Sequence, residues 1–138
     1  MAMLQFYTVV IEFAGAEPIT ERRQFDELPG HLVRLVQLPL GPARTFALTE
    51  GKKPIYTLNA GETEDLLRLL GQITVKAPWE AMVGCDGATC TLLLKGPMSE
   101  MTFNWWVQVP KGWESVGAVF DYVMKLARRQ GRGPAPCG

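Results

Sequence analysis

The chain has 138 residues, of which 47% are hydrophobic and 20% are charged, so its composition excludes wholesale disorder and collagen-like repeats. Fourteen Lys and Arg balance fourteen Asp and Glu, and this zero net charge argues against a nucleic-acid binder, which would normally carry a basic excess. No apolar run approaches the roughly 18 residues that span a bilayer, so we expect one α+β domain over residues 1–130, with a Gly/Pro-rich tail over 131–138 and no membrane partner.

Residues 4–13 are rich in β-branched and aromatic side chains and therefore predict a first strand. The stretch 2–16 loosely resembles a secretion signal. However, no Lys or Arg precedes it, and Gln5 and Glu12 interrupt its apolar run. We therefore expect a cytoplasmic protein that begins with a strand.

The next part of the chain predicts three further strands. Residues 22–28 fit either a short strand or an exposed connector, and 31–38 predict a strand that Pro39 ends. Residues 44–49 and 54–58 flank a polar turn and predict a hairpin.

A helix follows this hairpin. Asn59 can cap its start, with Glu62 three residues later completing a capping box, and Leu66, Leu69 and Leu70 then recur at helical spacing. A second hairpin is predicted over 90–95 and 101–109. The chain then becomes helical from Trp113 onwards, and Gly131 is a plausible stop.

The predicted order of strands and hairpins favours an α+β fold. Strands joined by short turns pair antiparallel, so we expect an antiparallel meander sheet of about five or six strands with two helices packed on one face. The two successive hairpin-plus-helix units suggest an internal structural repeat, although their sequences do not align convincingly.

The cysteines and the one histidine give no sign of a metal or catalytic site. Three cysteines are an odd number, so we expect Cys85, Cys90 and Cys137 to be reduced thiols, although a bridge between the first two across a tight turn is geometrically conceivable. The histidine His31 is not coupled by any motif to a nucleophile, and no phosphate-binding or zinc-protease motif is present. We expect no cofactor and favour a non-enzymatic protein.

The strand over 101–109 carries the most informative pattern. Its side chains alternate, so Phe103, Trp105, Val107 and Val109 should face the helices, while Thr102, Asn104, Trp106 and Gln108 share the other face. Trp106 is then a large aromatic among polar neighbours, which is typical of binding hot spots. The alternative is that a loop carrying Trp79, or the turn before Trp113, covers it.

Three short motifs in this region carry a resemblance. Asp86-Gly87-x-Thr89 leads into a strand, Trp105-Trp106 lies in the next strand, and Pro110-x-Gly112-Trp113 opens the last helix. Together they resemble a group of small bacterial proteins of unknown function, over about residues 84–126, although Val107 stands where that group has glycine. The resemblance implies a fold and no catalytic residues.

These observations favour a small bacterial protein that binds another protein, as an immunity-like or accessory domain, with Trp106, Asn104 and Gln108 as contact residues. The alternative is a small-molecule binder or enzyme with a pocket beside Trp106, Trp79 and Trp113. A third alternative is a subunit that self-associates through an edge strand.

Overall fold

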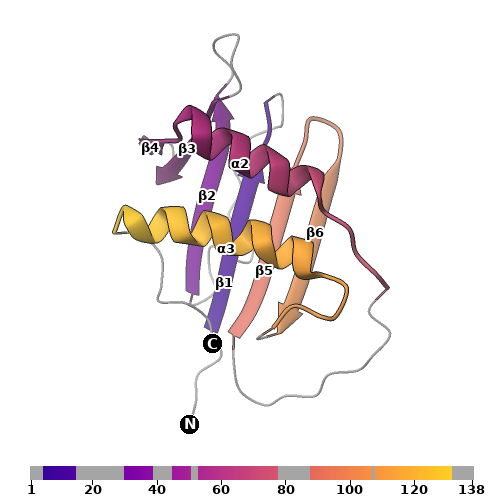
Figure 1. The fold of residues 1–138 in the computed structure, drawn as a ribbon. Helices are drawn as coiled ribbons and strands as arrows, with labels where there is room; N and C mark the ends of the chain where they lie inside the picture. Colours follow the sequence, from indigo (N-terminus) through magenta and orange to yellow (C-terminus); the bar gives the residue numbers. More distant parts are fainter. Residues whose placement is uncertain are drawn as a thin grey trace.

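The computed structural model describes residues 5–14, 30–38, 45–50, 53–77, 88–106 and 108–131. In these ranges the chain forms a six-stranded sheet with two helices on one face (Figure 1). The elements are β1 (Gln5–Glu12), β2 (Gly30–Leu38), β3 (Thr45–Glu50), β4 (Lys53–Thr57), α2 (Ala60–Gly71), β5 (Ala88–Lys95), β6 (Glu100–Trp106) and α3 (Glu114–Arg129). The α+β class is as predicted, whereas residues 22–28 and residues 132–138 of the predicted tail lie outside the described ranges.

The sheet is mixed rather than an antiparallel meander, so that part of the prediction is wrong. The strand order is β4-β3-β2-β1-β5-β6, and the central strand β1 pairs in parallel with both β2 and β5. Parallel neighbours need a connection of about a dozen residues or more. Residues 13–29 connect β1 to β2. The chain between β1 and β5 is much longer, residues 13–87, and it contains β2, β3, β4 and α2.

Both predicted hairpins are present. β3 pairs antiparallel with β4, and β5 pairs antiparallel with β6 through a turn in which the Gly96 N–H donates to the Ser99 carbonyl at 2.8 Å. β6 ends at Trp106, three residues before the predicted limit. The Gln108 N–H donates to the Trp106 carbonyl at 2.7 Å, and this short-range bond turns the chain out of the strand.

The helix boundaries follow the predicted signals. The Asn59 side chain accepts from the Glu62 N–H, and the Glu62 carboxylate accepts from the Asn59 N–H, which completes the capping box of α2. α3 begins at Glu114, directly after Trp113, and ends before Gly131, which has the positive φ of 71° that favours glycine at a helix stop. Neither helix is long and apolar enough to cross a membrane.

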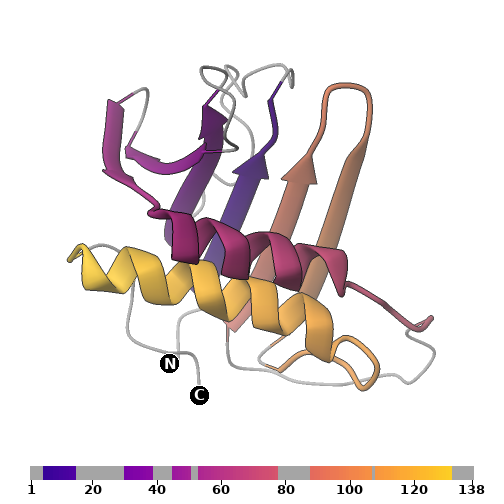
Figure 2. The ribbon, with the colours of Figure 1, turned by 45° about the horizontal axis from the view of Figure 1, so that its top comes forward.

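The main core lies between the sheet and the two helices, which run side by side across the strands (Figure 2). α3 supplies most of the helical part of this core because a continuous apolar stripe faces the strands, whereas only Thr63 and Leu66 of α2 are fully buried. The largest side chains that are almost fully buried on this side are Ile11, Leu35, Phe46, Leu48, Leu66, Leu92 and Leu126.

The opposite face of the sheet, called the open face below, has no helix of the described chain on it (Figure 2). Its centre is nevertheless buried: Val10 is 0% exposed and Leu93 is 2% exposed, and these two form a small apolar cluster of their own. Towards β6 the open face becomes exposed at Thr102 and Asn104. The open face is therefore accessible on its β6 side, and also at Leu32 of β2, which is 38% exposed.

Candidate functional site

Trp105 belongs to the core, as predicted. It is only 7% exposed, and its ring meets that of Phe120 of α3 edge to face, with the centroids 5.1 Å apart. Phe103, two residues earlier on the same face, is equally buried. The predicted alternation is therefore confirmed from Thr102 to Trp106, and Trp106 points to the open face, whereas Val107 lies outside the described residues.

Trp106 is half-buried on the open face, at the last position of the outermost strand. Its partner in the register is Thr89 of β5. Asn104 precedes it on the same face and is exposed, and Gln108, just beyond the strand, is exposed as well. The three residues predicted as contacts therefore lie close together along the chain, with accessible surface on each.

A cross-strand hydrogen bond orients Asn104. Thr91 Oγ1 donates to Asn104 Oδ1 at 2.7 Å, and the two residues are direct partners in the β5–β6 register. This bond fixes the orientation of the amide, so the Nδ2 group, which can only donate, points away from Thr91. The position beside Trp106 therefore presents a hydrogen-bond donor whose orientation the sheet fixes.

Trp113 lies on the helix side instead. Its indole N–H donates to the Lys76 carbonyl at 2.7 Å, and its ring meets Phe103 edge to face at 5.8 Å. Trp106 and Trp113 therefore lie on opposite faces of the sheet and do not line one pocket. Trp79, the third tryptophan predicted near this site, lies outside the described residues.

Trp113 has a structural function that the sequence did not reveal. It holds the segment after α2 against the start of α3, together with Ser115, whose hydroxyl donates to the Thr74 carbonyl and accepts from the Thr74 N–H, both at 2.8 Å. The contacts join residues about forty positions apart, so no local pattern could have indicated them.

A row of polar side chains crosses the open face and was also missed. Arg34 Nε lies 3.6 Å from Glu12 Oε1, and Thr49 is the register partner of Arg34 on the next strand. Glu12 is only 7% exposed, and within the described chain these buried atoms make no hydrogen bond. The available signal was the presence of Glu12 and Arg34 in otherwise apolar strands.

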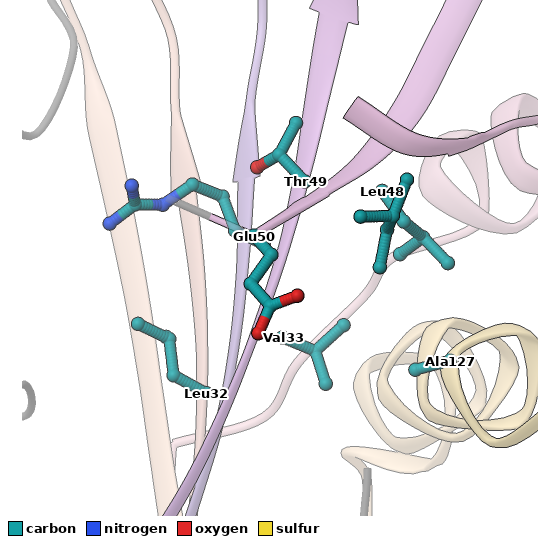
Figure 3. Close-up of a pocket in the computed structure, with 8 residues that line it drawn as sticks. Leu32, Val33, Leu48, Thr49, Glu50 and Ala127 are labelled. Carbon is teal, nitrogen blue, oxygen red and sulfur yellow. The ribbon is translucent and has the colours of Figure 1, made fainter. Parts of the chain in front are cut away.

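A small pocket of about 140 Å³ lies beside this row (Figure 3). Figure 3 shows Leu32 on one side of the strands, Leu48 and Ala127 on the other, and Glu50 between them. The pocket is thus a notch at the end of β3. Its volume is below the roughly 300–1,000 Å³ of ordinary ligand sites.

A larger groove of about 720 Å³ lies where β3 begins and α2 starts. Its walls are mostly apolar, with Leu58 and Leu67 as the largest apolar side chains, and Thr63, Glu64 and Arg68 supply its polar groups. None of the described tryptophans, Trp105, Trp106 and Trp113, lines it. This groove falls within the usual size range of ligand sites.

Glu62 connects three elements near this groove. Its Oε1 accepts hydrogen bonds from the Tyr56 hydroxyl and the Asn59 N–H, and its Oε2 lies 3.9 Å from Arg129 Nη1 of α3. The bond to this carboxylate raises the pKa of Tyr56 above its ordinary value of 10.0. Tyr122 of α3 donates to the Glu62 carbonyl at 3.2 Å, so the cluster joins β4, α2 and α3.

The remaining sequence candidates are placed only in part. The backbone of His31 lies in β2, and its side chain is outside the described part of the chain, as are Cys85 and Cys137. Cys90 is a thiol only 1% exposed in the core. Among the described residues, no three His, Cys, Asp or Glu side chains come together as a metal site would require.

Comparison of this chain with family models, curated proteins and solved structures found no match. The resemblance to a group of small bacterial proteins therefore stays a prediction.

Proposed function

We propose that this chain is a protein-binding domain of the immunity-like or accessory kind, and that its contact surface surrounds Trp106. This Trp106 surface consists of Trp106, Asn104 and Gln108, at and just beyond the end of the outermost strand. The observation that carries the proposal is the contrast between two adjacent tryptophans: Trp105 is buried in the core, whereas Trp106 is half-buried among exposed polar side chains.

The half-buried position suits a contact residue. The buried part of a large ring is held by the fold, so little conformational entropy is lost when a partner covers the remainder. The exposed polar residues around it resemble the polar rim of protein interfaces. Asn104 adds a donor whose direction the Thr91 bond already fixes. A partner with an apolar side chain for Trp106 and an acceptor for Asn104 would fit this surface.

The test compares proteins captured from the native host by the parent chain and by Trp106→Ala. A direct partner should bind the parent and lose at least about 2 kcal/mol of binding free energy with the variant, the usual threshold of a hot spot. Thr57→Lys, an exposed change at the opposite edge of the sheet, is the matched control and should bind like the parent. A purified partner with equal affinity for all three proteins would overturn the proposal.

The groove beside Leu58 and Leu67 supports a second candidate function, the binding of a small apolar molecule. Its volume of about 720 Å³ is the favouring observation. Leu67→Trp would fill part of the groove, so a compound that raises the melting temperature of the parent should not stabilise this variant. Trp106→Ala should respond to such a compound like the parent, which separates this candidate from the first.

A further inference from the structure

The two outer edges of the sheet differ in how they resist pairing with another strand. β4, at one edge, has only five residues and begins with Lys53 and Pro54, and its pairing with β3 is irregular between Leu48 and Thr49. A short strand, a lysine, a proline and a bulge are all features that keep edge strands from associating. The β4 edge is therefore protected.

The β6 edge has none of these features. β6 runs for seven residues without lysine or proline, and its register with β5 is continuous from Glu100 to Trp106. Phe, Trp and Thr dominate it, and these residues favour extended chain. In the described part of the chain β6 is the last strand in the sheet order, with only β5 beside it (Figure 1).

The hairpin geometry shows which main-chain groups face this outer edge. The bond from the Gly96 N–H to the Ser99 carbonyl makes these two residues a hydrogen-bonded pair, and such pairs alternate along an antiparallel ladder. Met101, Phe103 and Trp105 therefore direct their N–H and C=O groups to β5. The main-chain groups of the alternate residues point away from it, and these residues are Glu100, Thr102, Asn104 and Trp106.

We propose that β6 pairs antiparallel with β6 of a second copy of this chain, with the two-fold axis at Thr102. This register places Thr102 opposite Thr102 of the second copy and Glu100 opposite Asn104 of the second copy. The main-chain groups of Thr102 point outward, so the axial Thr102 pair forms two hydrogen bonds. The Trp106 carbonyl already accepts from Gln108 and is not needed. The two sheets become one continuous sheet.

The side chains of β6 are complementary in this register. Met101 is 50% exposed and lies on the helix face, where it meets Phe103 of the second copy. On the open face, Asn104 lies opposite Glu100 of the second copy, so a neutral amide faces a carboxylate and no like charges meet there. The axial pair of β-branched threonines packs well across strands. On the helix face apolar side chains thus lie opposite each other, and on the open face polar side chains do. No two charges of the same sign lie opposite each other.

This pairing shares Asn104 with the proposed Trp106 surface, but it uses neither Trp106 nor Gln108. Trp106 lies beyond the last paired residue, so its ring stays accessible in the dimer. Trp106→Ala should accordingly weaken binding of another protein and leave the dimer intact, whereas a change at Thr102 should do the reverse.

The experiment measures the mass in solution by sedimentation over a concentration series. The parent should reach twice the mass of one chain. Thr102→Lys places two lysines opposite each other and should weaken the dimer by about tenfold or more. Thr102→Val should keep it, because valine is β-branched, and Thr57→Lys at the protected edge should also keep it. Circular dichroism and melting curves verify that each variant is folded, which is expected because Thr102 and Thr57 are exposed.

Amide hydrogen exchange tests the register. Exchange of the Thr102 and Asn104 N–H groups should slow as the concentration of the parent rises, and should not change in Thr102→Lys. A parent that stays monomeric across the series, a Thr102→Lys variant that dimerises like the parent, or exchange at Thr102 that is independent of concentration would each overturn the proposal. A dimer lost through Trp106→Ala but kept in Thr102→Lys would place the interface elsewhere.

Discussion

The Tyr56 hydroxyl donates a 2.6 Å hydrogen bond to Glu62 Oε1, the same oxygen that accepts from the Asn59 N–H at 2.9 Å. One carboxylate oxygen thus completes the capping box of α2 and ties that helix to β4. Because the side chain of Glu62 is only 14% exposed, the cluster holds the helix at a fixed position on the edge of the sheet.

Removal of the Tyr56 hydroxyl should therefore loosen the attachment of α2. We expect Tyr56→Phe to lower the melting temperature at neutral pH, because Glu62 Oε1 loses one of its two donors. The pKa of Tyr56 is raised in the folded protein, so the hydroxyl stabilises the fold fully below its ordinary pKa of 10.0. This stabilisation is lost as the pH rises through the folded-state pKa. Melting curves of parent and variant should converge in alkali; a constant difference up to high pH would contradict this explanation.

The two adjacent tryptophans should differ sharply in their contribution to stability. Trp105→Ala removes a buried ring from contact with Phe120 and should cost about 3–5 kcal/mol of unfolding free energy. Trp106→Ala should cost clearly less, because that ring is only half-buried on the open face. Denaturant unfolding of the two variants side by side measures the difference. Equal, large losses would make Trp106 a packing residue and remove the basis of the proposed binding surface.

Two helical glycines should respond to alanine in opposite directions. Gly71, exposed at the end of α2, has no atom within 4 Å of an added Cβ, so Gly71→Ala should gain about 0.5–1 kcal/mol of stability. At the buried Gly117 of α3, an added Cβ would lie 3.0 Å from Val109 Cγ1. Overpacking of this kind costs about 1–3 kcal/mol, so Gly117→Ala should destabilise the protein.

A double-mutant cycle shows whether Val109 causes the loss at Gly117. Val109→Ala removes the two methyl groups that the new Cβ would meet, so Gly117→Ala should be tolerated much better in that background. If the loss is the same with and without the Val109 methyl groups, crowding against this side chain is not its cause.

The start of α3 should give the protein an acid-sensitive contribution to stability. Hydrogen bonds from the main-chain N–H groups of Glu114 itself and of Gly112 lower the pKa of the Glu114 carboxyl below its ordinary value of 4.5. The resulting stabilisation is present above 4.5 and is lost as the pH falls through the lower folded-state value. The melting temperature of Glu114→Gln should therefore be lower than that of the parent at neutral pH and equal to it in acid. Thermal melts across this range provide the measurement.

The sequence allowed good prediction of features whose causes are local. The capping box of Asn59 and Glu62 defined the start of α2, and the alternation along β6 correctly separated the buried Trp105 from Trp106. In each case the side chains that determine the structure are at most four residues apart. The same is true of the β3–β4 and β5–β6 hairpins, where the turn residues join the strands directly.

Features that depend on distant contacts could not be predicted in this way. The antiparallel meander was a natural extension of the two hairpins, yet the position of β1 depends on its pairing with β2 and β5 across long connections. Likewise, Trp113 was grouped with Trp106 because both are aromatic residues near the last turn. Its bond to Lys76 and its contact with Phe103 place it on the other face of the sheet.

The central position of β1 has a consequence for synthesis of the protein on the ribosome. Gln5 pairs with Ala88, so one edge of this apolar strand has no neighbour until β5 has been made. The ribosome adds about 5–20 residues per second, so synthesis of the chain from Gln5 to Ala88 takes roughly 4–17 s. During this time β3 and β4 can close as a local hairpin, but β1 still exposes Val9, Val10 and Ile11. A cell that overproduces this protein should therefore place its heaviest chaperone demand on chains stalled before residue 88.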